Sequence, residues 1–400
     1  MTKVLAGCRV IDHGTFITGP YAAMLLADLG AEVIKVERPG IGDPFRAFNG
    51  GLYSAQFRAF NGNKQSVVVN LEQEGDRDLL IRLIEDADVY IQNFRPGVAE
   101  RLGVGPDEMR ARNPRLVYCA ISGFGRDGPY AQRPTYDTVA QAMSGYLSMF
   151  VSPEAPRVTG PAVADGITGL YAAYGILGAL YERNNTGKGR LVEVSMIESM
   201  MHFSIEQYAH YFTSGVNPGP GDRSRLAQSY ALACADDKLI ALHLSSPEKF
   251  WEGLLAAIER PDLGRDARFA TRMDRVRNQV ALQDALRPVF RERPRLEWIA
   301  RLEKADVPYA PIYSLEEVLD DPHVQHLGVE RRVEHPTEGT VRTIRRPVVY
   351  DGDRDGIEIA AAPVLNEQGA AVRAASPAPA APEVAPATAA PRVQAGRVRS

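Results

Sequence analysis

Asp165 is the residue whose surroundings best suit covalent chemistry. It lies between two stretches rich in small residues, 160–164 and 166–169, and the apolar run that follows predicts a helix reaching residue 180. Small neighbours leave room for a bulky ligand, and a carboxylate in such a place can attack an activated acyl group. The flanking Gly166 would let its backbone N–H reach an oxyanion. A structural interpretation stays open beside this one, because Asp is also a favoured N-cap residue.

His202, Glu206 and His210 recur at four-residue intervals after Ser195. On one continuous helix this spacing would place all three near one face, where they could hold a metal ion. The same segment also carries many apolar side chains, namely Met196, Ile197, Met200, Met201, Phe203 and Tyr208. We therefore expect a helix packed on several sides, with its His and Glu side chains in hydrogen bonds, and no metal site.

The segments that must position these residues alternate between strand and helix. Residues 8–12 predict a short buried strand, and a helix opens at Gly19-Pro20 because Pro is tolerated at the first helical position. Residues 31–37 predict the next strand. Further strands are expected at 66–70, 89–93, 117–121 and 191–194, with a helix at 76–85. A βαβ opening followed by this pattern predicts an α/β fold with a mostly parallel sheet.

Such an opening can bind a nucleotide, and the turn after the first strand tests that idea. It contains Gly14 and Gly19 but no G-x-G-x-x-G, although Glu37 lies where a ribose-binding acid would sit and Arg38 follows it. We therefore do not expect an NAD(P) site, and an NADP-dependent dehydrogenase is kept only as an alternative. The 3′-phosphorylated adenosine of coenzyme A would use the same Arg38 without the glycine fingerprint.

Composition places the chain among globular proteins and excludes several functional classes. Of 400 residues, 45% are apolar and 24% are charged, and the formal net charge is −4. This charge argues against a dedicated nucleic-acid binder, which needs a strongly basic face. Cys8, Cys119 and Cys234 are too far apart in the sequence for a CxxC metal site or a disulfide framework. With no signal peptide and no stretch long enough to span a bilayer, we expect a cytoplasmic enzyme without nucleic-acid or membrane partners.

Several short motifs follow one another in a fixed order around these candidate residues. They are Gly19-Pro20, the segments 29–40, 63–67, 87–97 and 122–130, Ala164-Asp165, and the segment 186–195. Each motif alone is weakly specific, but their order and spacing together resemble the class III coenzyme A transferases over about residues 5–370. That family includes formyl-CoA transferase and carnitine CoA-transferase, and also the α-methylacyl-CoA racemases.

The resemblance implies a CoA-transferase that moves coenzyme A from an acyl-CoA thioester to a carboxylic acid. Asp165 matches the family nucleophile, which would attack the thioester to give a mixed anhydride and free CoA thiolate. Return of the thiolate would leave Asp165 as a CoA thioester, and a second acid would run the steps in reverse. Neither ATP, nor a metal, nor a permanently bound cofactor is needed. We expect the Asp165 carboxylate to be ionised at neutral pH and to need no base.

The resemblance also implies which residues contact coenzyme A. These positions are Thr18, Arg38, Asn93, Phe94, Arg101 and Tyr136. An Arg would pair with phosphate and a Phe would contact adenine, which suits their chemistry. Ile17 stands where a transferase relative has Gln, so any oxyanion contact from that Gln is lost.

Two further alternatives stay open beside CoA transfer and the dehydrogenase. The racemases of the family move an α-proton with a catalytic His followed by Asp, whereas the corresponding segment here reads Tyr136-Asp137. A phenol with a pKa near 10 is a poor base at neutral pH, so transfer is favoured, and Tyr136 could also do no more than shape the site. The second alternative is a catalytically inactive acyl-CoA-binding protein, against which Asp165 argues.

The resemblance implies two domains and an interlocked homodimer. Residues 1–200 would form the first part of a large Rossmann-like, CoA-binding domain, 201–228 a linker, and 229–315 a smaller α/β domain. Residues 316–373 would return to the large domain, which is therefore discontinuous in sequence. Residues 374–400 hold ten Ala, five Pro and no aromatic residue, and predict a disordered tail because they cannot bury enough apolar surface.

Overall fold

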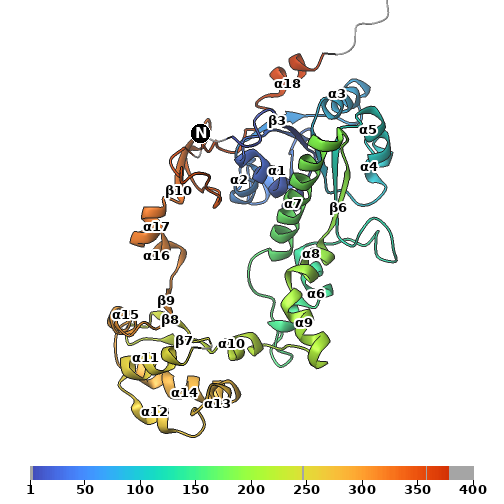
Figure 1. Cartoon of the computed structure of the whole chain (residues 1–400). Helices are drawn as coiled ribbons and strands as arrows, with labels where there is room; N and C mark the ends of the chain where they lie inside the picture. The colour runs from blue at the N-terminus through green and yellow to red at the C-terminus, as the bar shows by residue number, and fades with distance from the viewer. Residues whose placement is uncertain (1–2, 246, 357, 378–400) are drawn as a thin grey trace, which may run out of the picture.

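A six-stranded parallel sheet forms the centre of the larger lobe of the molecule (Figure 1). The structure is a computed structural model that describes residues 3–245, 247–356 and 358–377. In spatial order the strands are β3 (Lys64–Val68), β2 (Glu32–Glu37), β1 (Arg9–Asp12), β4 (Val89–Gln92), β5 (Val117–Ser122) and β6 (Leu191–Ser195). All neighbouring strands are parallel, so the predicted α/β fold with a parallel sheet is confirmed. The order reverses between β1 and β4, where α/β sheets bind their ligands.

Two long helices, α1 (Thr18–Asp28) and α7 (Val163–Thr186), pack against each other on one face of the sheet. Small residues allow the close approach. A Cβ atom on Gly169 would lie 3.0 Å from the carbonyl oxygen of Thr18 and 3.0 Å from the ring of Tyr21, so a larger residue would push the two helices apart by a few tenths of an ångström. This contact fixes the first turns of α7 beside the first turn of α1.

The opposite face is covered by α3 (Glu74–Glu85), α4 (Val98–Arg101) and α5 (Pro106–Arg112). Their buried side chains form one apolar cluster with the strands, including Leu79, Leu80, Leu83, Met109, Ile11, Ile34 and Tyr118. Acidic residues in the first turn of α3 and basic residues in the last turn of α5 suit the helix dipoles.

Helix α7 is longer and more apolar than expected. It has 24 residues and, among the described residues, it is the helix whose length and composition would allow it to cross a membrane. The expectation that no stretch reaches that length was therefore wrong. In the fold, α7 packs against α1, β5 and β6, and 44% of its most apolar window is buried. Its apolar residues therefore form part of the core of the larger lobe.

A three-stranded antiparallel sheet and five helices form the smaller lobe (Figure 1). The strands are β7 (Ser229–Ala233), β8 (Leu239–His243) and β9 (Tyr309–Ile312). The helices are α11 (Glu248–Ile258), α12 (Pro261–Arg265), α13 (Arg272–Arg277), α14 (Gln279–Phe290) and α15 (Arg295–Lys304). They enclose their own apolar core, which includes Trp251, Phe290 and Trp298.

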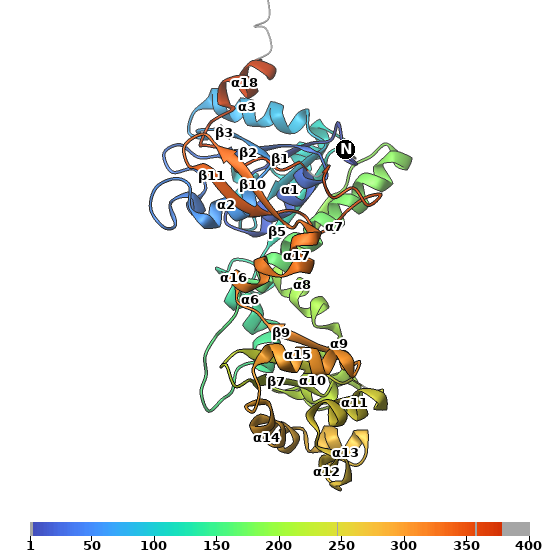
Figure 2. The same cartoon turned by 90° about the vertical axis from the view of Figure 1, so that its left-hand side faces the viewer.

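Two connections join the lobes on opposite sides of the molecule in Figure 1. One consists of α8 (Met196–Phe203), α9 (Ile205–Ser214) and α10 (Asp222–Leu226). The other runs through α16 (Leu315–Asp320) and α17 (Pro322–Leu327) to an antiparallel hairpin of β10 (Glu330–His335) and β11 (Gly339–Ile344). This hairpin lies beside the larger lobe in Figure 2. The domain boundaries remain predictions.

The last described segment covers the free edge of the large sheet at β3. Ser66 N donates to Gln368 Oε1 at 2.9 Å, and Asn366 N donates to Ser66 Oγ at 2.9 Å. Helix α18 (Gly369–Ala375) follows, with Val372 buried in the core and Arg373 paired with Asp76 at 2.7 Å. These contacts correct the predicted start of the disordered tail at residue 374, since the helix extends through 375. Residues 378–400 lie outside the described part of the chain.

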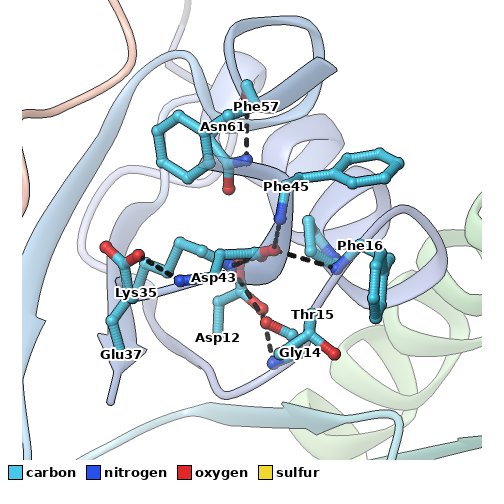
Figure 3. Close-up of polar contacts among 12 residues, drawn as sticks. Asp12, Gly14, Thr15, Phe16, Lys35, Glu37, Asp43, Phe45, Phe57 and Asn61 are labelled. Atoms are coloured by element: carbon cyan, nitrogen blue, oxygen red, sulfur yellow. Dashed lines mark hydrogen bonds and ion pairs between the residues drawn. The ribbon is translucent and has the colours of Figure 1, made fainter. Parts of the chain in front are cut away.

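Four buried charged side chains lie beneath the loop that follows β1 (Figure 3 shows most of them). Lys64 Nζ lies 2.8 Å from Asp12 Oδ2, and Lys35 Nζ lies 2.9 Å from Asp43 Oδ2 and 3.6 Å from Asp12 Oδ2. All four side chains are fully shielded from solvent. Burial lowers the pKa of Lys64 to about 8, although Asp12 opposes that shift. Strand β3 begins at this lysine, two residues earlier than expected, and its pairing with β2 starts with Lys64 opposite Val33.

The backbone of the loop hydrogen-bonds directly to this buried ion cluster. Gly14 N donates to Asp12 Oδ1 at 2.9 Å, and Phe16 N donates to Asp43 Oδ1 at 3.2 Å. Lys35 Nζ in turn donates to Gly14 O at 2.9 Å. Buried charges are tolerated only when they are paired and hydrogen-bonded. The cluster therefore fixes the backbone conformation of residues 13–18.

We expect the substitution Lys64→Met to lower the free energy of unfolding by about 3–5 kcal/mol, because it removes one partner of a buried ion pair. Urea denaturation followed by circular dichroism measures the loss, since both tryptophans lie in the smaller lobe and would not report on the larger one. The matched control is Arg112→Met, which breaks the exposed ion pairs of Arg112 with Glu85 and Glu108 and should change stability far less. Equal losses in the two variants would contradict the special role of the cluster.

Candidate active site

A cavity of about 190 Å³ lies at the carboxyl ends of β1, β4 and β5. Its walls come from the loops that follow these strands, at residues 15–18, 93–96 and 121–123, and from the segment 133–136. Asp165 and Met196 complete the lining. The cavity therefore lies at the point where the strand order reverses, which is the usual ligand site of such sheets.

Asp165 lies in the first turn of α7 and lines this cavity. It is the third residue of the helix, so the interpretation of Asp165 as an N-cap was wrong. The N-cap is Ala162, whose side chain makes no capping hydrogen bond. A carboxylate from α6 (Asp137–Met143) takes that place, because Asp137 Oδ1 accepts from Ala164 N at 2.8 Å and from Asp165 N at 3.3 Å. The Asp165 carboxyl is therefore not used as a capping acceptor.

Gly166 does not have the oxyanion role that was expected of it. Its backbone N–H donates to Ala162 O at 3.2 Å within the first turn of α7, so it is not directed at a ligand. The space beside it is open, since no atom lies within 4 Å of the position that a Cβ would take. The expectation that this space receives a ligand stays a prediction, because Gly166 is not among the residues that line the cavity.

Asn93 ties two walls of the cavity together. Its Oδ1 accepts from Thr15 N at 2.9 Å, and its Nδ2 donates to Thr15 O at 2.8 Å and to Thr18 Oγ1 at 3.0 Å. These contacts fix the loop after β1 against the end of β4. Asn93 and Thr18 both line the cavity, as expected for ligand contacts, but the amide of Asn93 is already hydrogen-bonded within the protein.

Aromatic side chains form the other walls of the cavity. Phe94 packs edge-on against the ring of His13, with 4.8 Å between ring centroids. Tyr136 is 64% exposed and lies edge-on to Phe16 at 5.8 Å. Phe16 has a φ of 62°, which is unusual for a bulky residue, and sequence reasoning did not find it. Its position shortly before the Gly19-Pro20 motif could have marked it as a candidate site residue.

Arg38 and Arg101 lie outside the lining of this cavity. Arg38 is exposed and its Nε donates to Gly42 O at 3.2 Å, and Arg101 is exposed at the end of α4. The arginines that do line the cavity are Arg95 and Arg133, which sequence reasoning did not single out. The guanidinium group of Arg133 stacks on the ring of Tyr130, 3.7 Å from its centroid. The structure thus brings together five of the seven expected residues, namely Thr18, Asn93, Phe94, Tyr136 and Asp165.

Glu37 is not placed to bind a ribose. Its two carboxylate oxygens each accept from Arg46 at 2.7 Å, and its Oε1 also accepts from Ser66 at 2.6 Å. The side chain is 1% exposed. The geometry required for the dehydrogenase alternative is therefore missing, because the expected ribose-binding acid is occupied by a buried arginine.

The structure also lacks the arrangement of side chains that the metal-binding interpretation requires. The expected continuous helix is broken at Ser204, which places His202 in α8 and places Glu206 and His210 in α9. Across residues 3–245, 247–356 and 358–377, no group of three or more His, Cys, Asp or Glu side chains is arranged to hold a metal ion. The expectation that this region is packed on several sides was wrong for α9, which has no buried residue, whereas α8 buries Met196, Ser199 and Met200.

Comparison with known proteins decides the family. Residues 5–369 match the family described as CoA-transferase family III. An acetyl-CoA:oxalate CoA-transferase from Acetobacter aceti is 36% identical over 378 residues, covering 93% of this chain and 96% of the relative. A succinyl-CoA:glutarate CoA-transferase from Mus musculus is 31% identical over 85% of this chain and 79% of the relative.

The chain belongs to CoA-transferase family III. A solved structure agrees: a CAIB/BAIF family protein from Brucella suis superimposes with a TM-score of 0.82 at 32% identity, covering 93% of this chain and 99% of that one. The resemblance read from the motifs is confirmed, and so is the prediction of a CoA-transferase enzyme.

The racemase alternative is not favoured in this family III transferase. The relatives described above are named as transferases. Within the described part of the chain, no histidine lines the cavity. The nearby His13 is fully buried, and burial lowers the pKa of its imidazole to about 4, so it packs as a neutral ring.

The ionisation of Asp165 in this transferase differs from the expectation. Burial first, and then the negative charge of Asp137, raise the pKa of the Asp165 carboxyl to about 7. The carboxyl is therefore part protonated at neutral pH, and the expectation of full ionisation was wrong. Sequence alone could not give this, because both causes, the burial of the carboxyl and the nearby Asp137 28 positions away, arise only in the folded chain.

We expect a carbodiimide with an amine to label Asp165 at pH 6–7, because carbodiimides react with protonated carboxyl groups. Labelling should fall as the pH rises through about 7, and peptide mass spectrometry of the digested protein measures it. Asp76 is the internal control, since its hydrogen bond to Arg373 lowers the pKa of its carboxyl and should leave it unlabelled in this range. Labelling of Asp165 that is complete only near pH 4 would contradict the raised pKa.

Proposed function

We propose that this CoA-transferase works through covalent intermediates on Asp165. The observation that supports this most is the position of the carboxyl, which lines the cavity from the first turn of α7 while another residue caps the helix. A helix N-terminus favours negative charge, so it stabilises the carboxylate that must attack. Open space beside Gly166 leaves room for the thioester.

In the first step an oxygen of the Asp165 carboxylate attacks the thioester carbonyl of an acyl-CoA. The carbon–sulfur bond breaks, and the products are a mixed anhydride on Asp165 and the CoA thiolate. The thiolate then attacks the aspartyl carbonyl and expels the first acid as a carboxylate, which leaves Asp165 as a CoA thioester. A second carboxylate attacks this thioester, and the same steps in reverse release the new acyl-CoA and free Asp165.

We propose that the ligand lies along the walls made by Thr18, Asn93, Phe94 and Tyr136. Phe94 presents an aromatic surface, and the hydroxyl and amide groups suit the polar arm of coenzyme A. Arg38 and Arg101 are exposed and outside the cavity, where they would pair with the phosphates, which remain hydrated. Arg95 and Arg133 supply further positive charge at the cavity itself.

The acids exchanged are proposed to be small carboxylates. The names of two relatives pair a CoA thioester with oxalate or with glutarate. A cavity of about 190 Å³ suits an acid of this size better than a long acyl chain. Acetyl-CoA and succinyl-CoA as donors, with oxalate, glutarate and succinate as acceptors, form the first panel to test.

The substitution Asp165→Ala should reduce CoA transfer by at least ~10³-fold, because it removes the attacking carboxylate. In the wild-type protein incubated with acyl-CoA, mass spectrometry should find coenzyme A attached to Asp165. The matched control is Asp107→Ala, an acid in the first turn of α5, which should retain full activity.

Transfer that survives Asp165→Ala would rule out this mechanism. A wild-type protein that binds acyl-CoA but forms neither adduct nor product would point to an inactive binding protein. Racemisation of a 2-methylacyl-CoA without any acceptor acid would restore the racemase alternative.

We further propose that the transferase is a homodimer, as the family resemblance implies. The support in the structure is a set of large apolar side chains on the outer sides of α7 and α9. Tyr174 and Tyr181 are 75% and 74% exposed, and Phe212 is 77% exposed. A single chain with such exposed aromatic side chains on two helices gains stability when a partner covers them.

Sedimentation equilibrium should give twice the chain mass of 43.8 kDa. The double substitution Tyr174→Glu with Phe212→Glu should weaken the dimer, because it places charges where apolar contact is expected. Leu296→Glu, at a residue of α15 in the smaller lobe that is also 77% exposed, serves as the control and should not change the mass. A wild-type mass of one chain at micromolar concentration would contradict the dimer.

A further inference from the structure

The first turn of α7 is held by a side chain from another helix. A helix leaves its first backbone N–H groups without partners inside the helix, and a side chain usually satisfies them. The N-cap residue Ala162 cannot do so. Asp137 supplies the acceptor instead, with Oδ1 at 2.8 Å from Ala164 N and 3.3 Å from Asp165 N. The backbone of the nucleophile is therefore bonded directly to the Asp137 carboxylate.

Asp137 is itself held firmly in this position. It is the first residue of α6, and that helix packs against both α7 and α8. Its second oxygen, Oδ2, accepts from Gln141 Nε2 at 2.5 Å, and Gln141 is buried. One oxygen thus serves the start of α7 while the other is anchored within α6. The side chain has no freedom to turn away without losing contacts at both oxygens.

We propose that Asp137 is the positioning residue for the nucleophile: it fixes the first turn of α7 through its backbone, and its charge keeps Asp165 from ionising too readily. This inference rests on the proposed role of Asp165. It assigns to the Asp of the Tyr136-Asp137 pair a task that does not require it to touch the substrate. A carboxyl group that is harder to ionise gives a more basic carboxylate once it has lost its proton. A more basic carboxylate is a stronger nucleophile.

Among the charged and titratable groups around Asp165, Asp137 is the one whose charge opposes the ionisation of Asp165. The other residues of the cavity lining with titratable or charged side chains are Arg95, Arg133 and Tyr136, and none of them is a carboxylic acid. From the neighbouring helices, α1 contributes Thr18 and α8 contributes Met196, and neither carries a charge. Burial and Asp137 together raise the pKa of Asp165 to about 7.

The decisive variant is Asp137→Asn, which keeps an oxygen for the two backbone N–H groups and removes the charge. Rotation of the Gln141 amide would present its oxygen to the new Asn Nδ2, so the variant can keep its hydrogen bonds. Without the like charge, the acid limb of kcat/KM should move to lower pH by about one pH unit. The pH at which a carbodiimide labels Asp165 should fall by the same amount. Asp137→Glu, which keeps the charge, should restore the wild-type profile.

Asp137→Ala loses both the charge and the cap, so it should show the same shift together with a loss of kcat of about tenfold or more at every pH. Asp137→Ser, which is neutral and retains an oxygen, replaces Asp137→Asn if that variant does not fold. The matched control is Asp321→Asn, because Asp321 accepts from His323 N and Val324 N at the start of α17, far from the cavity. It should leave both profiles unchanged.

The labelling measurement uses no acyl-CoA, so its outcome does not depend on the proposed chemistry. If Asp165 labels at the same pH in the wild type and in Asp137→Asn, the inference is overturned even when CoA adducts form on Asp165. If labelling shifts as expected but no adduct forms, the proposed function fails and the electrostatic link between the two residues stands.

Discussion

The architecture of the active-site cavity depends on two lysine ammonium groups and two carboxylates buried beneath the loop after β1. Removing such charges from water costs several kcal/mol for each ion unless every one is paired and hydrogen-bonded. Here the charges balance, and the remaining donors are used. Lys64 also donates to Pro20 O at 2.7 Å and to Asn61 Oδ1 at 2.8 Å, while Lys35 reaches Gly14 O. If the loop shifted, one of these buried charges would lose a hydrogen-bond partner, so the backbone of the loop is effectively rigid.

That rigidity makes an otherwise unfavourable conformation possible. Phe16 is held at a φ of 62°, which costs of order 1 kcal/mol for a bulky residue. The hydrogen bond from its N–H to the buried Asp43 carboxylate offsets that cost and points the aromatic ring at Tyr136. Asn93 then ties the same loop to the end of β4. The walls of the cavity are thus anchored from the sheet, whereas the first turn of α7, which carries Asp165, is anchored by Asp137 of α6.

Local patterns were enough to predict the elements, but not the contacts between distant segments. The βαβ opening and the position of Asp165 at the start of a helix follow from residues close together in sequence. The capping role of Asp137, the raised pKa of Asp165 and the pairing of Glu37 with Arg46 depend on segments that meet only in the folded chain. Lys35 and Lys64 gave no signal of burial, because a lysine in a strand usually reaches solvent. Arg38 carried a strong motif yet lies outside the cavity lining.

The closure of the β3 edge by residues near 366–368 has a consequence for how the chain is made. The two partners, Ser66 and Gln368, are 302 positions apart. At a synthesis rate of about 5–20 residues per second, the ribosome would complete the first strands roughly 15–60 s before the segment that covers their edge exists. During that interval the edge presents unpaired N–H and C=O groups, which invite pairing with other chains. The larger lobe can complete its native contacts only after residues 366–375 have been made, so this short segment, which includes α18, has a part in folding far greater than its length suggests.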